Sequence, residues 1–355
     1  MDHAHWMSRC LQLARLGASG AAPNPMVGAV LVKGDRILSE GWHQRPGSAH
    51  AERDCLQRPG GSPVPDDAVL YVNLEPCAHH GRTPPCSDLI IERGLKRVVV
   101  AHGDPFPKVN GQGVERLRRA GIEVIEGVLA DEARWMNRRF LTSVTKQRPY
   151  IVLKWAQSRD GLLDQHPRSA RGVQRISTPE TDVLVHRWRS EEQAILVGST
   201  TVLNDDPRLD VRHVEGRQPL RVLIDRGNRA PADSHVLDGT QATMLITTEE
   251  RSGTQAEQVI IASDEDPIER LFAELNERGI RSLLVEGGAK LHARFLQSGS
   301  WDEARVITGE GRFGSGTPAP RIASRIARSR DHATDRIDYF INASQQALPG
   351  EAWPW

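Results

Sequence analysis

The chain has 355 residues and a mass of 39.3 kDa, about the length of two ordinary domains. Lys+Arg and Asp+Glu are both 46, and this zero formal charge argues against nucleic acid or an anionic membrane as the main partner. No apolar run approaches the ~20 residues that span a bilayer, and four cysteines are too few for a disulfide scaffold. We therefore expect a soluble protein of the reducing cytoplasm.

The first half of the chain alternates helix and strand patterns. Helices are predicted over residues 5–16, from about 50, after 86, over 114–120 and over 130–141. Strands are predicted over residues 26–32, 36–42, 68–73, 97–101 and 122–126. Gly34 and Asp35 predict a hairpin turn between the first two strands. The alternation favours a mostly parallel α/β sheet that helices cover on both faces.

A domain boundary is predicted at Lys146–Pro149, which divides the chain into residues 1–146 and 147–355. Beyond it, strands are predicted over residues 150–155, 194–197, 220–224, 243–247, 259–261, 282–285 and 304–307. Helices are predicted over residues 181–189, 268–278 and 289–297. The second half is therefore also expected to be an α/β domain.

Three short segments of the first half carry metal-ligand side chains: His50-Ala51-Glu52, Pro76-Cys77 and Cys86. One imidazole and two thiolates are typical of a catalytic zinc whose fourth position is open, and H-x-E followed by P-C and a second cysteine is the signature of zinc deaminases. Zinc lowers the pKa of bound water toward ~7, and Glu52 would act as general acid and base. We expect one zinc ion per chain.

The spacing of the two cysteines leaves a second interpretation open. Residues 78–85 separate Cys77 from Cys86, whereas the generic signature has two intervening residues. Both cysteines would then be ordinary buried residues near a structural or surface histidine. His79 or His80 would alternatively complete a structural site with four ligands. The upstream H-x-E and the proline before each cysteine favour the catalytic interpretation.

Longer segments of the first half resemble one enzyme family. They are residues 24–28 (NPMVG), 50–52 (HAE), 73–86 (NLEPCAHHGRTPPC) and 104–113 (DPFPKVNGQG). The sequence is similar to the bifunctional riboflavin-biosynthesis deaminase/reductases (the RibD family), in which the long cysteine spacing is usual. The resemblance implies a cytidine-deaminase-like α/β/α domain that hydrolytically deaminates a diaminohydroxy-(phosphoribosylamino)pyrimidine.

The same resemblance assigns site residues in the first half. It implies that His50, Cys77 and Cys86 bind zinc and that Glu52 moves the proton. It places Asn24 and His43 at the pyrimidine, and Arg82 and Asp104 near the ribose phosphate. For Asn24 the competing interpretation is a turn residue before Pro25, and for Arg82 a solvated loop arginine.

The second half is less specific when it is taken by itself. Val285 to Leu291 runs from a strand through Gly287 and Gly288 into a helix, which suits an anion but is more often a tight turn. It lacks the G-x-G-x-x-G spacing, so a Rossmann dinucleotide fold is not indicated. Residues 200–212 favour a solvated loop.

Residues 154–161, 197–207 and 285–288 resemble the reductase domain of the same family, which implies a dihydrofolate-reductase-like α/β fold and reduction of the ribosyl group to ribityl by NADPH. The implied cofactor positions are Ala156, Arg175, Thr201, Asp205, Arg226, Gly288, Ala289, Lys290, Leu291, His292, Ala293 and Arg294. The implied substrate positions are Val173, Arg189, Leu209, Arg212 and Glu286. Arginines suit a phosphoribosyl ligand because guanidinium binds phosphate bidentately.

The chain departs from the family pattern at several places. Arg175 replaces a usual tryptophan and Arg226 a small hydroxyl residue, while Phe106, Arg159 and residues 308–314 also differ. These changes would either weaken NADPH binding or let the arginines contact its 2′-phosphate.

Three functions therefore stay open. They are the bifunctional enzyme, a deaminase with a degenerate reductase domain, and a zinc-stabilised ligand-binding protein without turnover. The expected partners are phosphoribosyl pyrimidines, with neither nucleic acid nor membrane, and the chain would assemble as a homodimer or homotetramer.

Overall fold

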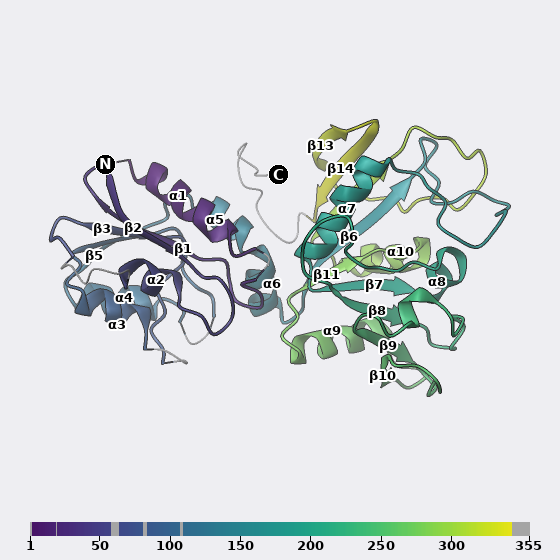
Figure 1. Ribbon diagram of the computed structural model, residues 1–355, viewed down its shortest axis with the longest axis horizontal. Helices are drawn as coiled ribbons and strands as arrows, with labels where there is room; N and C mark the ends of the chain where they lie inside the picture. Colours follow the sequence, from purple (N-terminus) through teal and green to yellow (C-terminus); the bar gives the residue numbers. More distant parts are fainter. Residues whose placement is uncertain (1, 19, 58–63, 81–83, 107–108, 343–355) are drawn as a thin grey trace. The chain divides into compact units, whose positions relative to one another are not determined.

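The computed structural model describes residues 2–342 except 19, 58–63, 81–83 and 107–108. The chain forms two compact units, one up to Gln147 and one that begins at Arg148 (Figure 1). Each unit is a mixed α/β structure around its own sheet, so the predicted fold class is confirmed. Within the described residues, no helix is both long enough and apolar enough to cross a membrane.

The first unit is built on a five-stranded sheet of order β2-β1-β3-β4-β5. Its strands are β1 Gly28–Lys33, β2 Arg36–Trp42, β3 Val69–Val72, β4 Arg97–Val100 and β5 Glu123–Glu126. β1 pairs antiparallel with β2 and β3, while β3, β4 and β5 pair in parallel. Four strands thus point the same way, as predicted, and β1 alone runs against them because the hairpin at Gly34 reverses the chain.

Helices cover both faces of this sheet (Figure 1). They are α1 His3–Arg15, α2 Ala51–Leu56, α3 Cys86–Glu92, α4 Gln112–Arg119, α5 Ala130–Met136 and α6 Arg138–Lys146. In β1, Ala29 and Leu31 join the core under α2, α3 and α4, and Val30 and Val32 join the core under α1 and α5. The strand is apolar from Gly28 to Val32 because both of its faces are buried, and only Lys33 at its end is exposed.

One helix prediction in the first unit is wrong at its centre. The pattern over residues 130–141 predicts a single helix, but α5 ends at Met136 and α6 begins at Arg138. The side chain of Asn137 turns inward between them. It accepts a hydrogen bond from the Met26 amide at 2.8 Å and donates to the Met26 carbonyl at 3.0 Å. This pairing with a residue far along the chain occurs where α5 ends and α6 begins, and helical periodicity gives no sign of it.

The second unit is built on a nine-stranded sheet of order β10-β9-β8-β7-β11-β6-β12-β14-β13. Its strands are β6 Tyr150–Gln157, β7 Ala194–Gly198, β8 Leu220–Ile224, β9 Thr243–Thr247, β10 Glu257–Ile260, β11 Ser282–Val285, β12 Glu303–Thr308, β13 Ile326–His332 and β14 Asp335–Ile341. Only the two pairings of β14 are antiparallel. Neither β13 nor β14 is among the predicted strands. β13 is a charged edge strand with no buried residue, whereas β14 does carry the strand alternation, with Ile337, Tyr339 and Ile341 buried.

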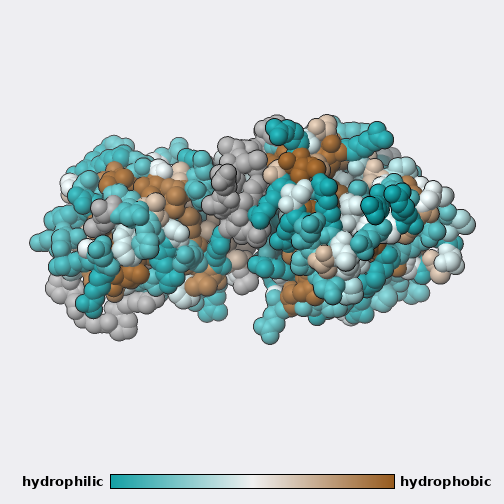
Figure 2. Space-filling view, turned by 90° about the horizontal axis from the view of Figure 1, so that it is seen from above, coloured by the Kyte–Doolittle hydropathy of each residue, from teal (hydrophilic) through white to brown (hydrophobic). Residues whose placement is uncertain are grey.

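Helices α7 Pro179–Glu191, α8 Ser199–Asp205, α9 Pro267–Glu277 and α10 Ala289–Ser298 pack on this sheet, with a short 3₁₀ turn at His235–Leu237. The predicted solvated loop over residues 200–212 is wrong, since α8 occupies its first half and Val202 and Leu209 are buried. The face seen in Figure 2 is mainly hydrophilic on both units, with smaller groups of apolar residues. The parallel strands β6, β7 and β11 end at one edge, where α8 and α10 begin.

Candidate functional sites

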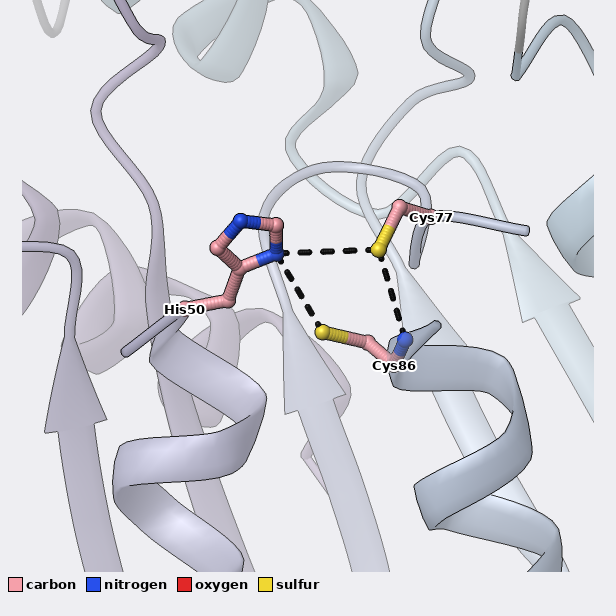
Figure 3. A group of neighbouring side chains, drawn as sticks. All are labelled: His50, Cys77 and Cys86. Atoms are coloured by element: carbon pink, nitrogen blue, oxygen red, sulfur yellow. Dashed lines mark hydrogen bonds between the residues drawn. The ribbon is translucent and has the colours of Figure 1, made fainter. Parts of the chain in front are cut away.

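The three predicted zinc ligands meet at the start of two helices. His50 immediately precedes α2, Cys77 follows β3, and Cys86 is the first residue of α3. His50 Nδ1 lies 3.6 Å from Cys77 Sγ and 3.4 Å from Cys86 Sγ (Figure 3). Tetrahedral zinc with ordinary bond lengths would hold a ligand nitrogen about 3.5 Å from a ligand sulfur. The spacing and the donor set therefore fit a zinc ion.

Within the described residues, the metal-type cluster contains these three side chains only. His79 faces Phe106 instead, with the two ring centroids 6.2 Å apart, and His80 is exposed. The structure thus gives no support to a fourth histidine ligand. Three protein ligands leave a coordination position for water or substrate, as in catalytic zinc sites.

The two thiols are electrostatically unequal. The hydrogen bond with Cys86, followed by that with His50, lowers the pKa of Cys77 to about 4. For Cys86 the effect is opposite, because the hydrogen bond with Cys77 and then burial raise the pKa of its thiol. The backbone amide of Cys86 also donates to Cys77 Sγ at 3.3 Å. The cluster thus favours one thiolate even before a cation adds its own charge, which is the ligand form that zinc needs.

Glu52 lies in the first turn of α2 and is 3% exposed. Burial raises the pKa of this carboxyl group from 4.5 to about 7. A carboxyl group with such a pKa exchanges a proton readily at neutral pH, which suits general acid–base catalysis.

Asn24 and His43 pair with each other beside the zinc ligands. Asn24 Nδ2 donates to His43 Nε2 at 3.0 Å, and His43 Nδ1 donates to the Ala49 carbonyl at 3.0 Å. The His43 ring meets the His50 ring edge-on, with centroids 5.6 Å apart. Burial lowers the pKa of His43. A neutral imidazole of fixed tautomer and a side-chain amide therefore lie next to the metal cluster.

The residues predicted near the ribose phosphate are described only in part. Arg82 lies outside the described residues. Asp104 follows β4, and its Oδ1 accepts a hydrogen bond from the Phe106 amide at 2.8 Å. The Asp104 amide donates to Glu75 Oε2 at 3.1 Å. The sequence did not indicate a role for Glu75, because its hydrogen-bond partner Asp104 is 29 residues away and the residues around Glu75 give no sign of it.

In the second unit, three predicted substrate positions, Arg189, Arg212 and Glu286, meet at a buried ion pair. Arg189 binds Glu286 bidentately, with Nε–Oε1 at 2.8 Å and Nη2–Oε2 at 2.7 Å, and Lys154 Nζ lies 3.8 Å from Glu286. Burial alone would raise the pKa of Glu286, but Arg189 and Lys154 outweigh it and lower this pKa to about 2. Burial also lowers the pKa of Lys154, a strand residue that sequence analysis did not select.

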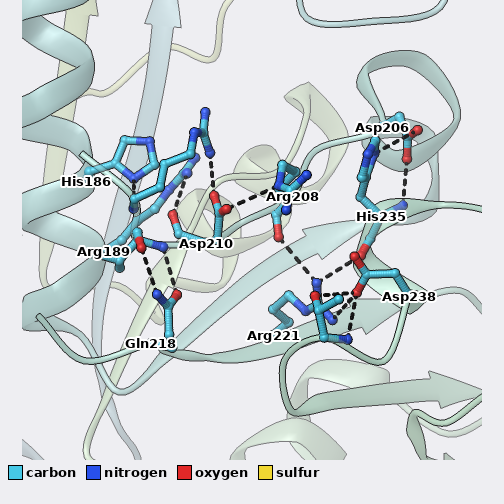
Figure 4. A network of polar contacts seen from close by, with 12 residues as sticks. His186, Arg189, Asp206, Arg208, Asp210, Gln218, Arg221, His235 and Asp238 are labelled. Carbon is cyan, nitrogen blue, oxygen red and sulfur yellow. Dashed lines mark hydrogen bonds and ion pairs between the residues drawn. The ribbon is translucent and has the colours of Figure 1, made fainter. Parts of the chain in front are cut away.

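The segment after α8 brings Arg212 to the same cluster through Asp210, which Figure 4 shows beside Arg189. Arg189 also donates to the Asp210 carbonyl at 3.2 Å, and Arg212 forms an ion pair with the Asp210 side chain. The Arg212 amide donates to His186 Nδ1 at 3.2 Å, and Leu209 is buried. Val173 is 71% exposed, and the structure gives it no contact with this group.

The predicted cofactor positions frame the starts of α8 and α10. A Cβ on Gly288, the residue that precedes α10, would lie 3.6 Å from Thr201 Oγ1 in α8. His292 is fully buried in α10, with its ring 5.0 Å from that of Trp155 in β6. Asp205, at the end of α8, accepts from Arg168 at 2.6 Å. Ala156 is the last residue but one of β6 and packs against the core cluster that contains Val185 and Trp188. The remaining positions belong to the first turns of α10: Ala289, Lys290, Leu291, Ala293 and Arg294.

Three arginines among the predicted cofactor positions already have protein partners. Arg175 forms an ion pair with Asp182, and Arg226 donates to the Ser263 carbonyl. Arg294 lies 2.6 Å from Asp266.

Comparisons with known proteins cover both units. Residues 1–102 match the cytidine and deoxycytidylate deaminase zinc-binding region, and residues 149–324 match the RibD C-terminal domain. Riboflavin biosynthesis protein RibD of Aquifex aeolicus is 41% identical over 319 residues, which cover 86% of this chain and 88% of the relative. RibD of Escherichia coli is 37% identical over 333 residues, 89% of each chain.

Solved structures agree with this similarity. The diaminohydroxyphosphoribosylaminopyrimidine deaminase/5-amino-6-(5-phosphoribosylamino)uracil reductase of Thermotoga maritima is 36% identical, with a TM-score of 0.85 over 96% of this chain and 98% of its own. Acinetobacter baumannii RibD is 32% identical and also has a TM-score of 0.85, over 96% of this chain and 98% of its own.

Proposed function

Since this chain belongs to the RibD family of bifunctional riboflavin-biosynthesis enzymes, a deaminase joined to a reductase, we propose the substrates, cofactors and residues of its two activities. Residues 1–146 hydrolytically deaminate 2,5-diamino-6-(5-phosphoribosylamino)pyrimidin-4-one. Residues 147–355 then use NADPH to reduce the ribosyl side chain of the resulting aminouracil to ribityl. Both reactions take place in the cytoplasm.

The observation that carries the deaminase proposal is the His50–Cys77–Cys86 cluster beside the buried carboxyl group of Glu52. The three ligands hold one zinc ion, which when bound supplies Lewis-acid activation of the attacking water. Glu52 accepts a proton from that water and delivers it to the leaving amine, which a carboxyl group with a pKa of about 7 can do in both directions. Asn24 and His43 orient the pyrimidine, and Asp104 and Arg82 bind its ribosyl-phosphate arm.

The reductase proposal rests on the Arg189–Glu286 cluster and on the residues around α8 and the start of α10. Arg189 and Arg212 bind the substrate phosphate, because both guanidinium groups lie at one cluster and Asp210 and Glu286 fix their positions. Val173 and Leu209 complete the substrate site. Helix α8 holds the cofactor through Thr201 and Asp205, and the start of α10 holds it through the segment from Gly288 to Arg294. Ala156, Arg175 and Arg226 contribute to the same site. NADPH supplies the hydride, and the protein orients it.

The experiment supplies the diaminopyrimidine to the purified protein and follows both ammonia release and NADPH oxidation. The unmodified chain should show both. Glu52→Gln should keep one zinc ion per chain, lose deamination roughly 10²–10⁴-fold, and still oxidise NADPH when the aminouracil is supplied directly. Glu123→Gln is the matched control, because that carboxylate is exposed and forms an ion pair with Arg97.

Each other outcome contradicts a specific part of the proposal. Full deamination by Glu52→Gln would refute the assignment of the proton carrier. Ammonia release without NADPH oxidation would identify a deaminase with a degenerate reductase. Absence of both reactions would favour a zinc-stabilised binding protein.

A further inference from the structure

The carboxylate of Glu75 is buried between the zinc ligand Cys77 and the segment that carries Asp104. Glu75 is 4% exposed and follows β3 two residues before Cys77. Four backbone N–H groups donate to it, each at 2.9–3.2 Å: those of Asp104 and Gly111 to Oε2, and those of Gly113 and Val114 to Oε1. A carboxylate that accepts from four amides is arranged to hold the backbone at Asp104 and at the start of α4.

Two of these donors belong to the first turn of α4. The residue before α4 is Gly111, which has no side chain to cap the helix, so the amides of Gly113 and Val114 need an acceptor from elsewhere. Glu75 supplies it. The backbones also approach closely here, because a Cβ on Gly113 would lie 1.9 Å from the Pro76 carbonyl oxygen. The start of α4 is therefore fastened directly to residues 75–76.

The same carboxylate fixes the backbone of Asp104. The Glu75 amide donates to the His102 carbonyl at 3.0 Å, and the Asp104 amide returns a bond to Glu75 Oε2. Glu75 thus binds the backbone on both sides of Gly103, at His102 and at Asp104. Its side chain caps the next turn through Phe106. The position of Asp104 relative to Cys77 depends on one side chain that contacts neither zinc nor substrate in the proposed site.

We propose that Glu75 is a positioning residue of the deaminase, which places Asp104 for the ribosyl-phosphate arm of the substrate. This inference rests on the function proposed above for Asp104. A carboxylate is required because each oxygen serves two donors. A glutamine would keep one oxygen and turn its NH₂ group toward the other two N–H groups, which would lose their acceptor. The zinc ligands would stay in place, because the hydrogen bonds of the Glu75 carboxylate go to backbone amides and not to the ligand side chains.

The test uses the full-length zinc-loaded protein and compares Glu75→Gln, Asp104→Asn and the double variant. Glu75→Gln should raise the KM of deamination roughly tenfold or more while kcat stays within about twofold. Zinc content and reduction of directly supplied aminouracil should be unchanged. The double variant should be scarcely worse than Asp104→Asn, because Glu75 acts through Asp104. Glu123→Gln serves again as the exposed-carboxylate control.

A second variant and a second readout keep the test independent of how well any one variant folds. Glu75→Asp retains both acceptor oxygens and should give an intermediate KM. Even without substrate, hydrogen exchange in Glu75→Gln should accelerate at the pair of amides that faces the new NH₂ group, either Asp104 and Gly111 or Gly113 and Val114. An unchanged KM, a loss of zinc, or KM effects that multiply in the double variant would overturn the inference. Failure of the unmodified chain to deaminate would instead refute the proposed function and remove the basis of the inference.

Discussion

Arg221 offers a test of how the second unit is held together. This arginine is 1% exposed at the start of β8, and Figure 4 shows its guanidinium group among polar partners from several segments. Its hydrogen-bond acceptors are Thr243 Oγ1 at 2.9 Å, the Arg208 carbonyl at 3.5 Å, the His235 carbonyl at 2.8 Å, Asp238 Oδ1 at 3.0 Å and the Gln241 carbonyl at 2.9 Å. The change to test is Arg221→Met, with Arg221→Lys beside it.

The expected magnitude follows from what each variant leaves behind. Methionine fills a similar length but donates no hydrogen bond, so the acceptors become unsatisfied and Asp238 loses its cation. Asp238 itself is exposed, so the cost comes mainly from the acceptors that lose their donor, at about 1 kcal/mol each, or about 3–5 kcal/mol of unfolding free energy together. Lysine keeps the charge but has three donors in place of five, so at least two bonds are lost at about 1 kcal/mol each.

Urea unfolding of the full chain, followed by fluorescence and by NADPH oxidation, measures this effect. The urea midpoint of the reductase unit should be highest in the native protein, lower in Arg221→Lys and lowest in Arg221→Met. Zinc content and deamination at low urea should stay unchanged. Arg187→Met is the matched control, since that arginine is 71% exposed and should matter little. If the lysine variant is as stable as the native protein, or if both variants lose less than about 1 kcal/mol, the multiple-acceptor reasoning is wrong.

Two further predictions concern acidity and metal removal. The pKa of Glu286 falls from 4.5 to about 2 in the folded chain, so its pairing with Arg189 stabilises the fold above about pH 4.5 and this contribution, about 3 kcal/mol, is lost as the pH falls toward 2. Arg189→Met should flatten the dependence of the urea midpoint on pH between 6 and 3, and an equal slope in both proteins would contradict the assignment. Removing zinc with a chelator should abolish deamination and leave NADPH binding, measured by fluorescence titration, within about twofold. Loss of both would show that the two units do not function independently.

Much of the candidate metal site is predictable from the sequence because its information is local. His50 and Glu52 are two residues apart at a helix start, and each cysteine follows a proline. Residue type alone restricts what an imidazole, two thiolates and a nearby carboxyl group can do. The core strands are predictable for a related reason, since strands buried on both faces are continuous apolar runs, as β1 shows.

The tertiary structure alone decides which polar side chains hold these elements in place. Glu75 finds its amides 29–39 residues along the chain, Arg189 finds Glu286 97 residues away, and Asn137 divides a predicted helix by binding Met26 across 111 residues. The strand β13 likewise escapes prediction, because a charged edge strand lacks the apolar pattern of a core strand. The physical reason is common to all of them. Hydrophobic periodicity reports which face of an element is buried, whereas a buried polar group is stable only where the folded chain brings its partners within bonding distance.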